Sequence, residues 1–301
     1  MQQRDIGDRA HDHVFDRGNA AGERGTRAVA WLTALMMVVE IAAGWVYNSM
    51  ALLADGFHMS SHALAIGLSA FAYAAARRYA ADSRFAFGTW KVEILGGFAS
   101  AVLLMAVVAL MVFGSVERLI APQPIHYPEA MVVAAVGLLV NIVSALLLGH
   151  AHHNDHHHHD LNLKSAYVHV IADAATSVLA IAALAGGWLL GWSWLDPVMG
   201  LAGAVLVAIW AKQLLVDTGK VLLDREMDHP VVDEIREVVA ANSKAGQTRI
   251  ADLHVWRVGR ASYACALSLV TGDPTLTADK VREWLSIHEE IVHSTIEVNR
   301  G

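Results

Sequence analysis

Two apolar stretches of the chain each carry a pair of metal-binding side chains four residues apart. His58 and His62 form one pair, and His169 and Asp173 form the other. A separation of four residues places two side chains on one face of an α-helix, one turn apart. Two such helices facing each other would supply three imidazoles and one carboxylate, which is enough to close a tetrahedral site. These ligand types favour zinc, cobalt or nickel over magnesium or calcium.

The alternative is that these side chains only form hydrogen bonds between helices, as polar residues do in membrane bundles. Ionisable groups inside a membrane span are costly, and their usual role is functional. One such histidine would be structural in most proteins. Two matched pairs in separate segments favour metal ligands.

Asp55 precedes His58 by three residues and His62 by seven, so it shares their helix face. It could accept a hydrogen bond from a ligand histidine in the second shell of the site and so fix its tautomer. It could also line the entry path, or cap the N-terminus of its helix. The sequence leaves these roles open, and it makes Glu40 and Asp217 weaker candidates that are better explained as polar contacts.

Residues 150–160 form a histidine-rich segment in the middle of the chain. Such a composition indicates labile metal binding without a fixed geometry. A purification tag is the usual alternative, but this segment lies between two apolar stretches, which favours a cytoplasmic metal-collecting loop. Its seven histidines are His150, His152, His153, His156, His157, His158 and His159.

The composition predicts a membrane protein. Hydrophobic residues make up 55% of the 301 residues and charged residues only 17%, compared with about 25% charged in soluble domains. The net charge of −7 gives no support to nucleic-acid binding. Cys265 is the only cysteine, which excludes an intramolecular disulfide and a cysteine-based metal site.

Six apolar segments are each long enough to cross a hydrocarbon core of about 30 Å, which takes about 20 helical residues. Basic residues precede the first segment and follow the second, fourth and sixth, so the positive-inside rule places both termini in the cytoplasm. A polar cytoplasmic tail is expected at 1–26, a six-helix transmembrane domain at 27–220 and a C-terminal domain at 221–301. The six segments are 28–48, 51–76, 91–115, 129–149, 163–190 and 196–219.

The C-terminal region predicts a small α+β domain with the order αββαβ. Amphipathic patterns indicate helices at 231–241 and 276–292, and alternating patterns indicate strands at 250–258, 262–270 and 294–299. A unit of this size has a small core and would gain stability from dimerisation.

Taken together, these residues resemble the cation diffusion facilitator family over nearly the whole chain from about residue 27. The resemblance implies a homodimer in the lipid bilayer, six spans per protomer and a cytoplasmic ferredoxin-like domain. It also implies metal efflux from the cytoplasm by proton antiport with alternating access. The motifs that carry it are residues 49–55 (SMALLAD), the two ligand pairs, 87–93 (FGTWKVE), 222–225 (LLDR) and 252–256 (DLHVW).

The same resemblance gives Lys91 and Asp224 a role in a salt-bridge interlock that holds the dimer together near the membrane surface. Ordinary surface charge is the alternative for this pair. Zinc exporters of the family usually carry aspartate where this chain has His62. The three-histidine set resembles the cobalt- and nickel-exporting branch, so cobalt is the expected cargo, with nickel or zinc next.

A second departure concerns regulatory metal in the cytoplasmic domain. Ala251 stands where zinc-regulated members often have histidine, and Ser268 and Glu297 occupy other positions of that pattern. A site in that pattern is therefore not expected. Further candidate ligands are His254, His288 and His293, for which a solvent-facing position is the alternative.

The expected function is transport without an enzymatic reaction or a cofactor. An intramembrane zinc protease would need a glutamate base beside its ligands, as in His-Glu-x-x-His, and the residues between His58 and His62 supply none. The other alternative is a metal-sensing membrane protein that binds without transporting. A bacterial inner membrane is the expected location.

Overall fold

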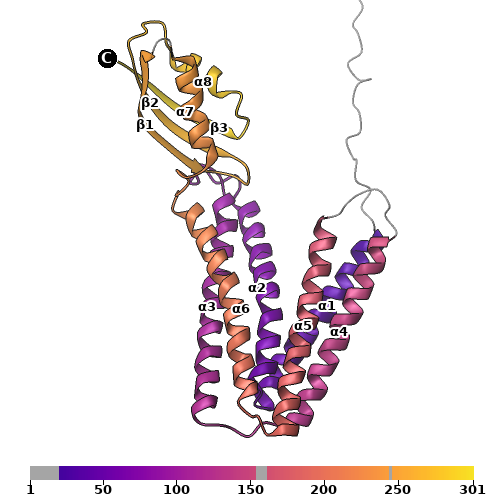
Figure 1. The fold of residues 1–301 in the computed structure, drawn as a ribbon. Helices are drawn as coiled ribbons and strands as arrows, with labels where there is room; N and C mark the ends of the chain where they lie inside the picture. Colours follow the sequence, from indigo (N-terminus) through magenta and orange to yellow (C-terminus); the bar gives the residue numbers. More distant parts are fainter. Residues whose placement is uncertain (1–19, 154–160, 244–245) are drawn as a thin grey trace, which may run out of the picture. The chain divides into compact units, whose positions relative to one another are not determined.

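The computed structural model describes residues 20–153, 161–243 and 246–301 (Figure 1). Within these ranges the side chains of some helical residues lie outside the description, among them His62 and His169. The described chain forms six long helices followed by a small domain of helices and strands. The long helices are α1 (Ala20–Val46), α2 (Met50–Arg78), α3 (Trp90–Ile120), α4 (Tyr127–His153), α5 (Leu161–Leu190) and α6 (Leu195–Leu222).

Four stretches of described helix are long and apolar enough to cross a bilayer. Only 22% to 33% of the residues in these stretches are buried, so most of their side chains keep accessible surface that could contact lipid. The apolar part of α1, Trp31–Val46, is shorter, so six spans stay a prediction. The four stretches are Trp90–Ile120, Tyr127–Ser144, Asp173–Leu190 and Leu195–Leu222.

The chain separates into two compact units. The first contains residues up to 60 together with 113–203, and in it α4 packs against both α1 and α5. Glycines also allow the close approach of α1 and α2: a Cβ atom at Gly56 would lie 2.8 Å from Ile41 Cγ1, and one at Gly44 would lie 2.7 Å from Leu53 Cγ. Small residues at such contacts are typical of helix packing in membranes.

The start of α2 is set by a carboxylate from α6. Asp196 accepts hydrogen bonds from the Ser49 hydroxyl at 2.6 Å and from the backbone N–H groups of Met50 at 2.7 Å and Ala51 at 3.1 Å. The first N–H groups of a helix have no partner within the helix, and a negative charge there is favourable. Asp196 therefore fixes where α2 begins and so the direction in which each later α2 side chain points.

The second unit contains residues 61–112 and 204–301. Its helices also approach closely, since a Cβ atom at Gly96 of α3 would lie 2.5 Å from Ala72 Cβ of α2. The connection between α2 and α3 packs on the C-terminal domain, where the Phe87 and Trp256 rings meet edge to face at 5.5 Å. Two segments that carry the family resemblance, 87–93 and 252–256, thus meet in space.

The C-terminal domain packs two helices against one three-stranded sheet. Strand β2 lies in the middle, antiparallel to β1 and parallel to β3. Ile235 and Val239 of α7 and Val281 of α8 are buried in the same core as Leu267 and Leu269 of β2. The element order agrees with the predicted αββαβ. The elements are α7 (Pro230–Asn242), β1 (Thr248–Arg257), β2 (Tyr263–Thr271), α8 (Ala278–Leu285) and β3 (Ile291–Arg300).

The predicted helix at 276–292 is wrong in its length. Thr277 caps its N-terminus, and α8 ends at Leu285 with Ser286 as the C-cap. The chain then turns, and from Ile291 onward it pairs with β2. Ile291 lies opposite Tyr263 in the parallel register. The residues between α8 and β3, including His288 and Glu290, therefore lie in a loop.

Candidate metal centre

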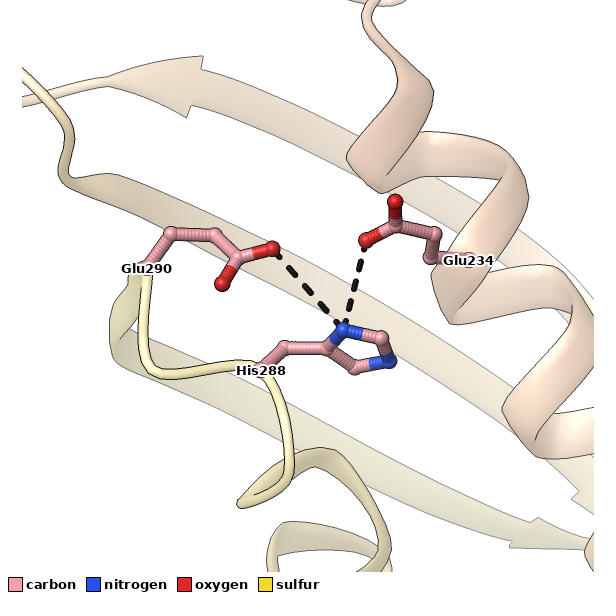
Figure 2. A group of neighbouring side chains, drawn as sticks. All are labelled: Glu234, His288 and Glu290. Carbon is pink, nitrogen blue, oxygen red and sulfur yellow. Dashed lines mark ion pairs between the residues drawn. The ribbon is translucent and has the colours of Figure 1, made fainter.

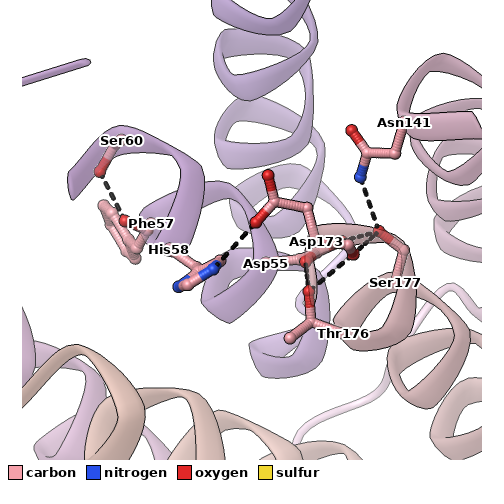
Figure 3. A network of polar contacts seen from close by, with 8 residues as sticks. All are labelled: Asp55, Phe57, His58, Ser60, Asn141, Asp173, Thr176 and Ser177. Carbon is pink, nitrogen blue, oxygen red and sulfur yellow. Dashed lines mark hydrogen bonds and ion pairs between the residues drawn. The ribbon is translucent and has the colours of Figure 1, made fainter. Parts of the chain in front are cut away.

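The structure brings one residue of each predicted ligand pair into contact. His58 Nε2 on α2 lies 3.0 Å from Asp173 Oδ1 on α5 (Figure 3). Both side chains are buried, with 3% and 4% of their surface exposed. An ionisable pair held in the apolar interior of a helical bundle is expensive, and such pairs mark ion or proton sites.

The distance between the two atoms also suits a shared metal ion. Two ligands at about 2.0–2.2 Å from a tetrahedral zinc ion lie about 3.3–3.6 Å apart. His58 Nε2 and Asp173 Oδ1 would have to separate by only a few tenths of an ångström to reach that spacing. The contact is thus compatible with either a hydrogen atom or a metal ion between the same two atoms.

The structure describes the backbones of His62 and His169 as helical, within α2 and α5, but their side chains lie outside the description. Their helices place them four residues from His58 and Asp173 respectively, and their part in the site stays a prediction. The side chains of His150, His152 and His153 at the end of α4 are likewise outside the description. His156, His157, His158 and His159 belong to 154–160, which is outside the described residues.

Asp55 is held by two hydroxyl groups of α5. Its carboxylate accepts hydrogen bonds from Thr176 Oγ1 at 2.8 Å and Ser177 Oγ at 2.7 Å (Figure 3). It is buried and is the sixth residue of α2, so it does not cap the helix, a task that falls to Asp196. Asn141 Nδ2 of α4 donates to Ser177 Oγ at 3.3 Å and extends the network to a third helix.

This network lies next to the His58–Asp173 contact along both helices. Asp55 precedes His58 by three residues, and Thr176 and Ser177 follow Asp173 by three and four, so the two contacts join α2 to α5 one turn apart. Sequence reasoning found Asp55 but not its partners. Thr176 and Ser177 could have been predicted as partners, because hydroxyl residues inside an apolar span commonly form hydrogen bonds across helices.

The two weaker acidic candidates differ in their surroundings. Glu40 is fully buried in α1, and its carboxylate oxygens have no hydrogen-bond partner among the described residues. Asp217 of α6 is exposed and accepts hydrogen bonds from Gln213 Nε2 at 3.0 Å. Of these two candidates, Glu40 is therefore buried inside the helical bundle and Asp217 is not.

Lys91 and Asp224 form an ion pair within one chain. Lys91 Nζ of α3 contacts Asp224 Oδ1, which follows the end of α6. Lys220 Nζ of α6 contacts a different carboxylate, Asp228 Oδ1, at 2.8 Å. Because 35% and 49% of the Lys91 and Asp224 side chains are exposed, the pair contributes little to stability by itself, about 0–1 kcal/mol.

Two of the C-terminal positions where family members can carry regulatory ligands, Ser268 and Glu297, contact each other. Ser268 Oγ donates to Glu297 Oε2 at 3.0 Å on the surface of the sheet. His254 is exposed beside Asp252, and the His293 ring packs edge to face on Phe87.

Residues 26–223 match the family model described as the cation efflux transmembrane domain. The chain is 30% identical over 303 residues to the zinc transporter ZitB of Escherichia coli (strain K12), covering 96% of this chain and 92% of that protein. It is 29% identical over 298 residues to the metal cation efflux system protein CzcD of Cupriavidus metallidurans, covering 95% and 89%. It is also 29% identical over 292 residues to the zinc transporter ttm-1 of Caenorhabditis elegans, covering 92% and 70%. The similarity extends beyond the transmembrane part into the C-terminal domain in each case.

Proposed function

This chain belongs to the cation efflux family, the cation diffusion facilitators, and on that premise we propose that it exports cobalt, with nickel or zinc as further cargo, in exchange for protons. Membership makes the protein an integral membrane transporter of metal cations and not an enzyme. It also confirms the resemblance carried by the sequence motifs. The metal, the coupling to protons and the ligand set are the proposed parts.

The contact between His58 and Asp173 carries the proposal. A hydrogen bond at 3.0 Å requires one hydrogen between the two atoms, whichever atom carries it. A metal ion bound to the same atoms must displace that hydrogen, because metal ligands have to be deprotonated at the coordinating atom. Metal and proton therefore compete for one place, which is the chemical requirement for exchanging one for the other.

The complete site is proposed to contain His58, His62, His169 and Asp173. His62 lies four residues after His58 on α2, and His169 lies four residues before Asp173 on α5. Adding these two histidines to the described contact gives four ligands. Asp55 is proposed to position these ligands through Thr176 and Ser177, not by direct contact with the metal. Access to the site from alternate sides of the membrane would then carry the ion across.

The choice of cobalt is supported by the replacement of a usual aspartate by His62. The resulting three-histidine set resembles that of the cobalt- and nickel-exporting branch, and a third imidazole in place of a carboxylate makes the site less negative. Two of the relatives named above are zinc transporters, so zinc is the principal competing cargo. The experiment below separates these ions.

The remaining arrangement is proposed as follows. The protein would be a homodimer in a bacterial inner membrane, with both termini and the histidine-rich segment 150–160 in the cytoplasm. That segment would collect metal before entry. The ion pair between Lys91 and Asp224 would brace the protomers near the membrane surface.

Uptake of cobalt, nickel and zinc into inverted vesicles tests the proposal. Wild-type protein is expected to favour cobalt, and His58→Ala is expected to abolish uptake of all three ions. His254→Ala is the matched control, because this histidine is exposed in the C-terminal domain and its removal is expected to leave transport intact. An imposed pH gradient should change the rate of uptake by wild type.

Three results would contradict parts of the proposal. Uptake of zinc alone would overturn the metal assignment. Uptake that is indifferent to the pH gradient would overturn proton exchange. Unchanged uptake by His58→Ala would remove the His58–Asp173 contact from the transport site.

A further inference from the structure

A second group of metal-binding side chains converges in the C-terminal domain. Glu234 projects from α7, while His288 and Glu290 lie in the loop between α8 and β3 (Figure 2). One oxygen of each carboxylate and one imidazole nitrogen all lie within 4.8 Å of one another. All three residues are partly buried, and His288 is the most enclosed, with 15% of its side chain exposed.

The backbone holds these three residues in place. Glu234 lies beside the fully buried Ile235, which packs α7 into the domain core. The His288 N–H donates to Leu285 O at 3.0 Å, and Tyr263 N of β2 donates to Glu290 O at 2.7 Å. Ligands on such anchored backbone need little rearrangement before they bind an ion.

The distances are those of ligands around an ion. His288 Nδ1 lies 3.3 Å from Glu234 Oε2 and 3.8 Å from Glu290 Oε1. Both values exceed the usual 2.7–3.2 Å of an N–H···O hydrogen bond. They bracket the spacing of about 3.3–3.6 Å between two ligands of a tetrahedral zinc ion.

The charges of Glu234 and Glu290 also favour binding of a cation beside His288. Two carboxylates converge on one imidazole nitrogen, and among the described residues neither carboxylate pairs with a lysine or arginine. The other ring nitrogen, His288 Nε2, is buried and has no hydrogen-bond partner in the described part of the chain. The imidazole therefore faces the two carboxylates with Nδ1. A divalent ion bound between these atoms would neutralise both carboxylates.

We propose that Glu234, His288 and Glu290 bind one divalent transition-metal ion of the zinc class, which clamps α7 to the loop between α8 and β3. An imidazole ligand disfavours magnesium and calcium. Three protein ligands leave a fourth position for water, so the ion would exchange more readily than in a closed structural site. The site uses none of residues 251, 268 and 297, where the family pattern led us to look for regulatory ligands. The proposal for this site does not depend on metal binding at the transmembrane site.

Hydrogen exchange measured by mass spectrometry on the full-length protein tests the clamp locally. Metal is removed with a chelator, and Zn²⁺ or Mg²⁺ is then added at equal concentration. Zn²⁺ is expected to slow exchange in peptides covering 230–242 and 286–291, and Mg²⁺ is not. The readout is confined to these peptides, so binding at the transmembrane site or in segment 150–160 does not enter it.

Two variants and one control decide the assignment. His288→Ala and Glu234→Gln are each expected to abolish the Zn²⁺-dependent slowing of exchange. Glu234→Gln is nearly isosteric and changes a half-exposed side chain, so this variant is expected to keep the fold. His254→Ala, in the same domain, is expected to retain it. The proposal is overturned if wild type shows no slowing, if Mg²⁺ produces the same slowing, or if Glu234→Gln responds to Zn²⁺ as wild type does. Failure of metal transport with the slowing intact would contradict only the function proposed for the transmembrane site.

Discussion

Replacing Asp55 by asparagine tests whether the network between α2 and α5 positions the metal ligands. The carboxylate accepts two hydroxyl hydrogen bonds, from Thr176 at 2.8 Å and Ser177 at 2.7 Å. Asparagine keeps the shape but presents one neutral oxygen and one NH₂ group, so the hydrogen bonds to a charged carboxylate are replaced by weaker neutral contacts, one of them with the NH₂ group as donor to a hydroxyl oxygen. The substitution therefore loosens α2 from α5 without leaving a cavity.

The magnitude follows from the contacts. A hydrogen bond to a charged group contributes about 1.5–3 kcal/mol. Both hydroxyls also lie 2.8 and 3.0 Å from the Asp173 carbonyl oxygen, to which they can turn, so the loss falls at the lower end. Since about 1.4 kcal/mol is a factor of ten, we expect Asp55→Asn to weaken cobalt binding about 10-fold. Loss of an outer-shell partner of a metal site has a similar cost, about 10- to 100-fold.

The assay is equilibrium dialysis of purified protein with cobalt, together with initial uptake rates in inverted vesicles. KM for cobalt is expected to rise more than kcat falls, because Asp55 supports ligands and does not itself carry the ion. Asp217→Asn is the matched control, since this aspartate is also in a membrane helix but is exposed and paired with Gln213.

A double-mutant cycle identifies the route of the effect. If Asp55 acts through Ser177, the losses caused by Asp55→Asn and Ser177→Ala will sum to more than the loss in the double variant. Wild-type cobalt affinity in Asp55→Asn, or an equal loss in Asp217→Asn, would refute the positioning role. Fully additive losses would refute the part played by Ser177.

Three further predictions concern selectivity, stability and pH. His62→Asp should raise zinc uptake relative to cobalt in the vesicle assay, and an unchanged preference would mean that selectivity is set elsewhere. Ile235→Ala removes a fully buried side chain of α7 and should destabilise the C-terminal domain by about 2–5 kcal/mol, measured by denaturant unfolding; a loss below about 1 kcal/mol would contradict the described core. Burial raises the pKa of the Cys265 thiol to about 11, above the ordinary value of about 8.5. The neutral thiol favours the folded state, so its contribution should be complete below about pH 8.5 and lost as the pH rises toward 11. Cys265→Ala should flatten this alkaline part of the stability profile, and an unaltered slope would contradict the assignment.

Several features were predictable because they depend on local spacing. That His58 and Asp173 each lie in a helix with a histidine four residues away follows from the helical period alone, while the joint role of the four side chains stays a prediction. The order of elements after residue 230 follows from apolar patterns of period 3.6 and 2. The length of the helix starting near 276 was predicted wrongly. The local pattern contains no information on the pairing of residues from Ile291 onward with β2.

What the sequence determined by itself was the membrane character, the family motifs and the candidate ligands, since composition and short-range periodicity are properties of the chain. Only the tertiary structure decided which of these residues meet. That His58 touches Asp173, that Asp55 is held by Thr176 and Ser177, and that Asp196 caps α2 all depend on how helices are rotated and shifted against one another. The meeting of Glu234 with His288 likewise depends on the packing of α7 beside the loop that precedes β3. Rotation and shift are set by packing across the whole bundle or domain, and no short stretch of sequence contains that information.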